Sequence, residues 1–244
     1  MSMRGWPPSL QLLKKRAAEA LRGAATDCLL CGAAEAASLV CGACERRLER
    51  IASACTVCAL PLPEPGTCGA CLERPPTFGN ATAVFAYRFP LDRLVQRFKY
   101  AGDLALGRWL GAALADRVGA ATVPRPDVLV VPPLGRGRLR ERGFNQALEL
   151  ARPVAARLAL PVSRDGVVRL HEAAVQAALP RAARWANLRG AFRCEADFHG
   201  LDVAIVDDVL TTGATAEAMA RALADAGARH VRIWAVARTP EPGQ

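Results

Sequence analysis

The sequence predicts an α/β protein with a parallel sheet, preceded by a small cysteine-rich module. Two observations predict this organisation: eight of the nine cysteines lie between positions 28 and 71, and beyond Ala81 short apolar runs alternate with stretches of helical periodicity. Strands and helices that alternate along a chain form a parallel sheet with helices on both faces. The 244 residues are enough for one large domain, or for one domain and a small module.

Four apolar runs are expected to be strands, and four stretches of helical periodicity are expected to be helices. The expected strands are AVFAY (83–87), VLVV (128–131), VAIV (203–206) and HVRIWAVA (230–237). The expected helices are 91–100, 104–118, 144–160 and 215–227, with a kink or break at Pro153 in the third. The tract from Leu170 to Asp202 has weak periodicity, and a connection of this length is typical of a functional lid.

Composition and charge exclude several classes of protein. Hydrophobic residues make up 52% and charged residues 23%, which excludes wholesale disorder and low-complexity fibres. No stretch reaches the roughly 20 consecutive apolar residues of a membrane-spanning helix. The basic residues at 14–16 leave the N-terminus without an apolar block of signal-peptide length. We therefore expect a cytoplasmic protein without an integral membrane span. The formal net charge is +9, and it falls to about +5 if eight cysteines bind two Zn²⁺ as thiolates. This charge, together with a cluster of arginines, permits contact with nucleic acid.

The cysteine-rich module is a tandem repeat of Cys-x-x-Cys pairs. Each cysteine of the first two pairs recurs 27 positions later, as Cys28 does at Cys55. Two such turns on facing hairpins place four thiolates about 2.3 Å from one Zn²⁺, so we expect two structural zinc ions. Redox-active or merely buried cysteines are the alternative. The expected ligands are Cys28, Cys31, Cys41, Cys44, Cys55, Cys58, Cys68 and Cys71.

The order of the pairs along the chain leaves two ways to build the zinc sites. Sequential pairing, first with second and third with fourth, is expected, and the spacing also permits a cross-braced pairing. Pro75 and Pro76 end the module because two prolines interrupt any continuing element. The expected domains are an N-terminal helix (1–24), a double zinc ribbon (25–76), an α/β domain (77–240) and a tail (241–244).

The segment VAIVDDVLTTGAT, residues 203–215, carries the main candidate site. Its apolar residues form a buried strand, Asp207 and Asp208 follow at the carboxyl tip, and Thr-Thr-Gly turns into a helix. A helix N-terminus offers backbone N–H groups to a phosphate, and Gly213 permits a close approach. Two carboxylates beside that phosphate indicate a ligand with hydroxyls, or a shared cation, as in a ribose 5-phosphate. An ordinary strand–turn–helix with acidic residues is the alternative.

A second candidate site is the arginine-rich segment 131–146, which follows the VLVV run. Guanidinium groups bind phosphate through paired hydrogen bonds, so a loop of this kind at a strand tip is suited to pyrophosphate. A solvated basic loop is the alternative. The arginines are Arg136, Arg138, Arg140 and Arg142.

The run from 203 to 215 resembles the ribose-phosphate signature of the type I phosphoribosyltransferases. The resemblance implies that the α/β domain has their fold. It also implies that Asp207 and Asp208 contact the ribose 2′ and 3′ hydroxyls of phosphoribosyl pyrophosphate, and that the following loop holds its 5-phosphate. The residues of this loop are Thr211, Thr212, Gly213, Ala214 and Thr215.

Together with the cysteine repeat, the motifs RERGFNQ (140–146) and FKYAGD (98–103) resemble the ComF family, phosphoribosyltransferase-like proteins associated with bacterial competence and DNA uptake. This resemblance implies that Lys99 reaches the pyrophosphate and that Arg184 lies in a loop over the site. The chain departs from the family at His171 and Ala173, where Arg and Thr are usual, and at Gly135, which replaces a more polar residue.

The resemblance implies one of two functions. As an enzyme, the protein would transfer the phosphoribosyl group to an unknown acceptor, with Mg²⁺ bridging the pyrophosphate and the ribose hydroxyls and with Lys99 and Arg184 assisting catalysis. As a binding protein, it would sense phosphoribosyl pyrophosphate or a nucleotide and engage single-stranded DNA or a competence protein. The aromatic content of 5% argues against a surface on which nucleic-acid bases stack.

Overall fold

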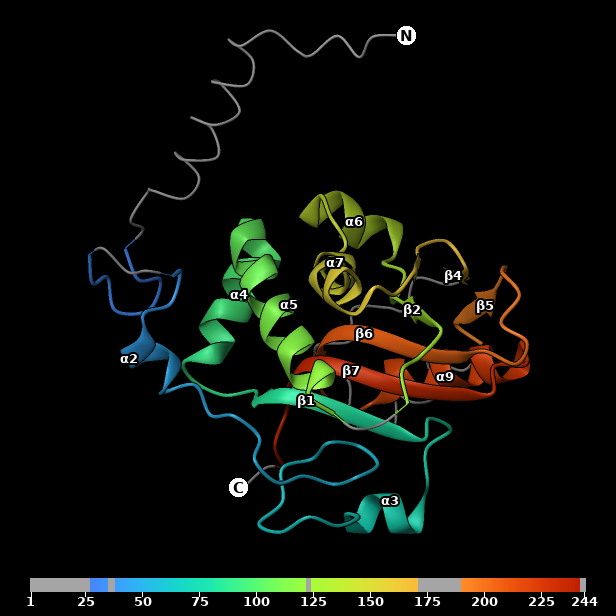
Figure 1. Cartoon of the computed structure of the whole chain (residues 1–244). Helices are drawn as coiled ribbons and strands as arrows, with labels where there is room; N and C mark the ends of the chain where they lie inside the picture. The colour runs from blue at the N-terminus through green and yellow to red at the C-terminus, as the bar shows by residue number, and fades with distance from the viewer. Residues whose placement is uncertain (1–26, 35–37, 122–123, 171–189, 242–244) are drawn as a thin grey trace, which may run out of the picture. The chain divides into compact units, whose positions relative to one another are not determined.

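The computed structural model describes residues 27–34, 38–121, 124–170 and 190–241 (Figure 1). The chain divides into two compact units, Met1–Arg46 and Arg47–Gln244. The boundary falls between the second and third Cys-x-x-Cys pairs, so each unit holds one half of the cysteine repeat. The expected N-terminal helix lies outside the described residues. In the part of the chain that is described, no helix combines the length and the apolar character needed to cross a bilayer.

The larger unit is built on a five-stranded parallel sheet with the order β1-β7-β6-β2-β3. Its two longest strands pair from Asp202 opposite His230 to Leu210 opposite Arg238. The predicted parallel sheet and its four strands are confirmed, whereas β3 has two residues and is too short to leave a periodic pattern. The strands are β1 (Asn80–Ala86), β2 (Val128–Val130), β3 (Val162–Ser163), β6 (Asp202–Leu210) and β7 (His230–Arg238).

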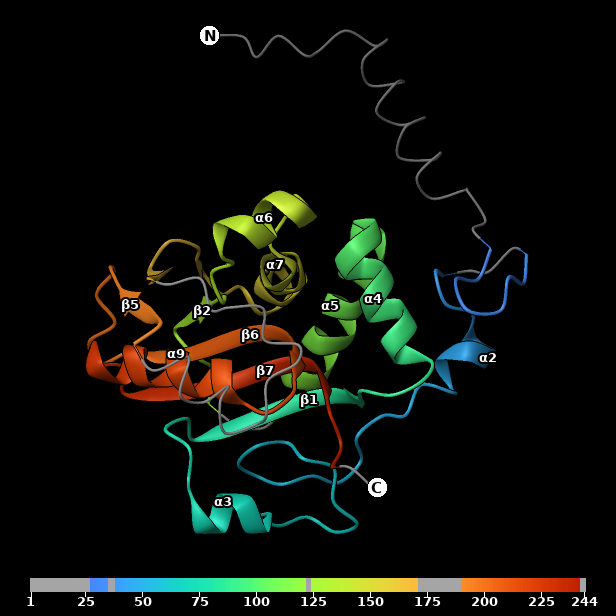
Figure 2. The same cartoon turned by 180° about the vertical axis from the view of Figure 1, so that it is seen from behind.

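Helices cover both faces of this sheet, as predicted. Figure 1 shows α5 on the near side of the sheet, and the reversed view in Figure 2 shows α9 in front of β6 and β7. On the α9 side, Ile205 and Ile233 of the sheet pack with Met219 of the helix in one apolar core. The helices are α4 (Leu91–Ala101), α5 (Leu104–Gly119), α7 (Gln146–Leu158) and α9 (Ala214–Asp225).

The arginine-rich segment is not a loop, which corrects the prediction. It forms the helix α6 (Arg136–Arg142), which ends at Gly143 with a φ of 76°. Arginine is a good helix former because its unbranched side chain keeps most of its rotamers in a helix. A left-handed residue after the last turn is a common helix end, and glycine adopts that conformation without strain.

Pro153 does not break α7, which continues through it to Leu158. A proline inside a helix cannot make the usual backbone hydrogen bond, and α5 packs closely against α7 at this point. A Cβ atom on Gly111 of α5 would lie 2.8 Å from the Leu150 carbonyl oxygen and 2.8 Å from Pro153 Cγ. Glycine at this position therefore lets the two helices approach closely.

A small antiparallel pair flanks the expected lid. β4 (Val167–Arg169) pairs with β5 (Phe192–Cys194), with Val168 opposite Arg193. The centre of the expected lid, residues 171–189, lies outside the described residues. It includes Arg184, His171 and Ala173.

The second half of the cysteine repeat is packed into the larger unit. The chain entering it runs along β1, where Ile51 N donates to the Val84 carbonyl and Ala86 N donates to the Glu49 carbonyl. Ile51, Ala59 and Phe78 belong to the same apolar core as Ile233. The short helix α3 (Gly69–Glu73) begins directly after Cys68 and buries Cys71. This half of the repeat therefore shares its core with the sheet.

Candidate functional site

Asp207 and Asp208 lie near the carboxyl end of β6, inside the strand. The sequence places them after the strand, but β6 continues to Leu210 because it pairs with β7, with Val209 opposite Ala237. Successive side chains of a strand point to opposite faces, so the two carboxylates diverge. Each is fixed by the backbone: Asp208 N donates to Asp207 Oδ1 at 2.8 Å, and Val209 N donates to Asp208 Oδ1 at 2.6 Å.

Lys99, from the last turn of α4, is the cation closest to these carboxylates among the ion pairs of the described residues. Its Nζ lies 2.9 Å from Asp208 Oδ2. Both side chains are mostly buried, with 19% of Lys99 and 14% of Asp208 exposed. The structure thus brings together three residues that the sequence analysis selected from two distant motifs.

Burial and the neighbouring charges shift the pKa values of Asp207 and Lys99. Burial raises the pKa of Asp207 to about 7, and the neighbouring Asp208 carboxylate adds to the effect. For Lys99, burial acts to lower the pKa, but the attraction of Asp208 outweighs it and the pKa is raised. Lys99 therefore stays protonated at neutral pH, while Asp207 changes charge close to neutrality.

The loop after β6 leads directly into α9. Gly213 is the residue before the helix and has a φ of 79°, a conformation that other residues adopt only with strain. The Thr212 hydroxyl accepts a hydrogen bond from Ala214 N at 3.4 Å. Thr211 is exposed, and Thr215 is half-buried in the first turn of α9. The first N–H groups of a helix have no partner within it, so this turn suits an anionic group beside the carboxylates of β6.

The arginine helix α6 lies beside α4. The guanidinium carbon of Arg142 is 5.2 Å from the centre of the Tyr100 ring, and Arg142 also donates to Gln146 Oε1 at 2.9 Å. Phe98 and Phe144 form a second contact between the two segments, with ring centres 5.5 Å apart. Because Tyr100 follows Lys99, α4 joins the carboxylates on β6 to the arginines on α6.

The other candidate arginines are exposed, or lie partly or wholly outside what the structure describes. Arg140 and Arg138 are exposed on α6. Arg136 begins α6, but its side chain is outside what the structure describes. Arg184 is outside the described residues altogether.

Two functional candidates were missed by the sequence analysis. Arg238, the last residue of β7, and Glu217, in the first turn of α9, are buried charged residues on either side of the loop 211–213. A charged residue that ends an apolar strand was the available signal for Arg238. Nothing in its sequence context indicates what it contacts.

The cysteines form two tetrads by sequential pairing, which confirms the expected order. In each tetrad the four sulfur atoms lie within 4.8 Å of one another. The distances of 3.8 Å from Cys31 Sγ to Cys41 Sγ and 3.7 Å from Cys58 Sγ to Cys68 Sγ match the edge of a tetrahedron of thiolates around a metal with bonds of about 2.3 Å. Four sulfur donors in this geometry fit a closed structural metal site.

Backbone N–H groups point at one sulfur in each tetrad. Cys41 N donates to Cys28 Sγ at 3.3 Å, and this is the main reason why the pKa of Cys28 is lowered to about 6. Burial acts to raise the pKa of Cys55, but hydrogen bonds from the backbone of Cys68 and Cys58 outweigh it and lower the pKa to about 7. Such bonds favour the thiolate, which is the form that binds a metal.

Comparison with known proteins identifies relatives of both parts of the chain. Residues 25–72 match the family described as double zinc ribbon domain, and residues 144–243 match the family described as phosphoribosyl transferase domain. The DNA utilization protein YhgH of Salmonella typhi is 35% identical over 168 residues, which cover 67% of this chain and 74% of that protein. Competence protein F of Haemophilus influenzae is 31% identical over 170 residues, with the same coverage of the two chains.

Among the solved structures that match, two phosphoribosyl-related enzymes have TM-scores below 0.5. The glutamine phosphoribosylpyrophosphate amidotransferase from B. subtilis, complexed with ADP and GMP, has a TM-score of 0.36 and 22% identity, and the match covers 52% of this chain and 25% of that one. A purine phosphoribosyltransferase from Pyrococcus horikoshii has a TM-score of 0.32 and 22% identity, over 53% of this chain and 70% of that one. The family relationship therefore rests on the sequence relatives and the two matched domains.

Proposed function

Since the chain belongs to the ComF family, in which a double zinc ribbon precedes a phosphoribosyltransferase domain, we propose that it binds phosphoribosyl pyrophosphate with Mg²⁺ and acts in the use of DNA taken up by competent cells. The observation that carries the binding proposal is the ion pair between Lys99 and Asp208, which places a cation beside two carboxylates at the loop 211–213. The compartment that we propose is the cytoplasm, whose reducing conditions keep the eight thiols available for metal.

Each part of the site has a role in this proposal. Asp207 and Asp208 accept hydrogen bonds from the ribose 2′ and 3′ hydroxyls. The backbone of the segment 211–215 binds the 5-phosphate, with the Thr211, Thr212 and Thr215 hydroxyls as further donors and with Ala214 contributing its backbone N–H. Lys99 and the α6 residues Arg136, Arg140 and Arg142 bind the pyrophosphate.

Transfer would break the bond between ribose C1 and the pyrophosphate oxygen, and the pyrophosphate would leave with the electron pair. Mg²⁺ bound to the pyrophosphate would reduce the charge that develops on it. Lys99 and the arginines donate hydrogen bonds to the leaving group, while Asp207 and Asp208 hold the ribose in place. A nucleophile on the acceptor then forms the new bond to C1 and releases a proton, with stabilisation that is mainly electrostatic. In this scheme Arg184 assists from the tract between β4 and β5.

Zinc is the metal that we propose for both tetrads, because four thiolates at tetrahedral spacing without an open position are typical of structural zinc. The expected stoichiometry is two zinc ions per chain, measured by elemental analysis of the purified protein. A stoichiometry of two iron ions with a visible charge-transfer absorption would contradict this assignment.

The second candidate function is a sensor. The family relatives named for DNA utilization and competence favour a protein that binds phosphoribosyl pyrophosphate without consuming it and engages single-stranded DNA or another competence protein. The exposed arginines of α6 favour contact with DNA, although the proposed transferase needs the same side chains for pyrophosphate.

Calorimetric titration with phosphoribosyl pyrophosphate tests the proposal. We expect Mg²⁺-dependent binding by the wild-type protein, and loss of at least 100-fold in affinity in the Asp207→Asn/Asp208→Asn variant. Asp225→Asn, at the exposed end of α9, is the matched control and should bind like the wild type. Absence of binding by the folded wild type would overturn the proposal. Pyrophosphate release on addition of candidate acceptors would then separate the transferase from the sensor.

A further inference from the structure

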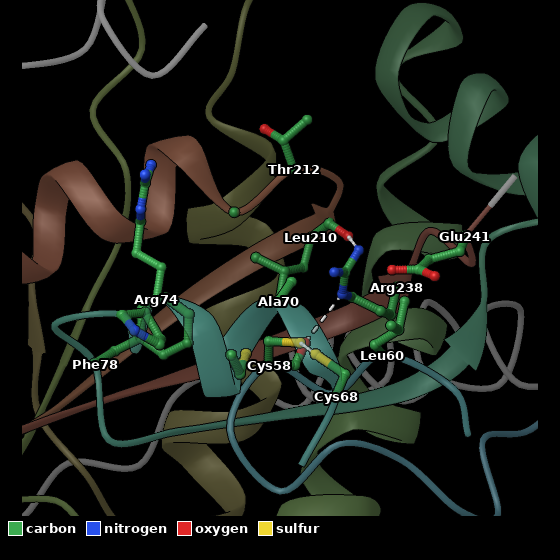
Figure 3. A pocket seen from close by; sticks show the side chains of 13 residues that line it. Cys58, Leu60, Cys68, Ala70, Arg74, Phe78, Leu210, Thr212, Arg238 and Glu241 are labelled. Atoms are coloured by element: carbon green, nitrogen blue, oxygen red, sulfur yellow. Dashed lines mark hydrogen bonds between the residues drawn. The ribbon is translucent and has the colours of Figure 1, made fainter. Parts of the chain in front are cut away.

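Arg238 connects the second cysteine tetrad to the loop that follows β6. Its guanidinium group is buried, with 6% of the residue exposed. Nε donates to the Cys58 carbonyl at 3.0 Å, and a terminal nitrogen donates to the Leu210 carbonyl at 3.0 Å and to the Thr211 carbonyl. Figure 3 shows this side chain between Leu210 and Cys58, with dashed lines to both residues. One guanidinium therefore holds the start of the loop 211–213 against a cysteine of the tetrad.

A second connection reaches the other end of the same loop. Thr77 donates from its backbone N and from its hydroxyl to the two carboxylate oxygens of Glu217, each at 2.8 Å. Glu217 is buried in the first turn of α9 and also accepts from Arg221. Thr77 directly follows Pro76, at which the expected zinc-ribbon module ends. Both ends of the loop are thus tied to this half of the repeat and the residues after it.

A pocket beside Arg238 is lined both by the tetrad and by the loop. Its lining residues include Cys58 and Cys68 of the tetrad, and Thr212 and Gly213 of the loop. The apolar contacts of Ile51 and Ala59 with the sheet core lie on the same side of the molecule as α9. Leu210 and Ala214, on either side of the loop, are buried in this same core. The polar contacts of Arg238 and Glu217 are added to this packing, one at each end of the loop.

We propose that the second tetrad, when metal is bound, positions the loop 211–213 through Arg238, so that metal at this tetrad controls the affinity of the phosphate-binding loop. The inference rests on the proposed function in taking this loop as the ligand site. Cys58 lies in a turn whose shape the four metal–sulfur bonds would fix, because small modules of this kind fold with their metal. Without the metal, the buried Arg238 guanidinium loses the Cys58 carbonyl as a fixed acceptor, and an unpaired buried donor is costly.

Hydrogen exchange of the ligand-free protein tests the inference directly. In the Cys68→Ser/Cys71→Ser variant, backbone amides of residues 207–217 are expected to exchange at least tenfold faster than in the wild type. The Cys41→Ser/Cys44→Ser variant is the matched control from the smaller unit, and its exchange over 207–217 should stay at the wild-type rate. Unchanged exchange in the first variant, with its zinc content reduced from two ions to one, would overturn the inference.

Loss of the tetrad could unfold the whole larger unit, and faster exchange in α5 would reveal this. A second variant keeps the test decisive in that case. Arg238→Met removes the connection and leaves every cysteine in place. We expect two bound zinc ions, faster exchange over 207–217, wild-type exchange in α5, and a dissociation constant for phosphoribosyl pyrophosphate raised about tenfold. Arg238→Lys should restore part of the protection. Wild-type exchange of the loop in Arg238→Met would overturn the inference.

The two proposals fail separately. If the wild type does not bind phosphoribosyl pyrophosphate but the loop still loosens in both variants, the proposed function fails and the positioning by the tetrad stands. If the wild type binds the ligand and the loop does not loosen, the positioning fails and the proposed function stands.

Discussion

Lys99 Nζ lies 2.9 Å from Asp208 Oδ2, so an ion pair joins the last turn of α4 to the carboxyl end of β6. The pair is mostly buried and lies next to Asp207, the carboxylate whose pKa is raised to about 7. In the proposed site one cation balances part of the charge of two acidic residues.

Lys99→Met is expected to lower the affinity for phosphoribosyl pyrophosphate at least tenfold and to lower the free energy of unfolding by about 1–3 kcal/mol, because it leaves Asp208 buried without its partner. Urea unfolding measures the stability and calorimetry measures the affinity. Lys99→Arg, which keeps the charge, should lose less of both. A double-mutant cycle with Asp208→Asn should give a coupling energy well above zero, and strictly additive effects would contradict the pairing.

Asp207→Asn is expected to stabilise the ligand-free protein at pH 8 and to have little effect at pH 4. The folded-state pKa of about 7 is above the ordinary value of 3.8, so the folded chain binds an extra proton between these values. Stability therefore falls as the pH rises through this window. Removing the carboxylate should raise the melting temperature at pH 8 by about 2–4 °C for each kcal/mol recovered. Thermal unfolding at both pH values checks this, and an equal shift at pH 4 and pH 8 would be inconsistent with the raised pKa.

Asp202, at the start of β6, should give the opposite dependence of stability on pH. Hydrogen bonding from Arg229 lowers its pKa to about 2, and His230 adds to the effect. A carboxyl whose folded pKa is below its ordinary value stabilises the fold above that ordinary value, and the contribution is lost as the pH falls from about 4 to about 2. Asp202→Asn should therefore lower the melting temperature at pH 7 and have a vanishing effect near pH 2. Asp165→Asn, an exposed aspartate, is the control, and identical pH profiles for the two variants would refute the assignment.

Gly213→Ala is expected to cost about 1 kcal/mol of stability, because its φ of 79° is in the left-handed region. It should also weaken binding of phosphoribosyl pyrophosphate, because the new methyl group lies where the 5-phosphate approaches the backbone. Gly200→Ala is the matched control: Gly200 has a φ of 71°, and a Cβ there would meet nothing within 4 Å, as is also true of Gly213. We expect the two variants to lose the same stability, and only Gly213→Ala to lose affinity for the ligand. Equal affinities would show that the ligand does not approach this glycine.

Much of the architecture was predictable because it depends on patterns of residues that are close together in the sequence. The repeat of the Cys-x-x-Cys pairs predicted both tetrads, and the VAIV and HVRIWAVA runs predicted the central strands that pair as β6 and β7. The sheet order and the extension of β6 through Asp207 and Asp208 were not predictable, because they depend on pairing with β7, which lies later in the chain. Polar residues after an apolar run indicate the end of a strand unless a neighbouring strand continues to pair with them.

The candidate site was predictable in its residues but not in its connections. The motifs selected Lys99 and Asp208 independently, and only the fold places them in contact. The position of the arginine segment after a strand predicts a loop. In the structure Tyr100 and Gln146 both contact Arg142, in the last turn of a helix. Arg238 and Cys58 are 180 positions apart, and no sequence pattern indicates their hydrogen bond.

The proposed site is best tested by a crystal structure of the protein with phosphoribosyl pyrophosphate and Mg²⁺. We expect the 5-phosphate within hydrogen-bond distance of the backbone N–H groups of residues 211–215, and the ribose hydroxyls on the carboxylates of Asp207 and Asp208. Lys99 or an arginine of α6 should contact the pyrophosphate. A ligand bound elsewhere on the protein, or a ribose that does not touch either carboxylate, would rule out the proposed site.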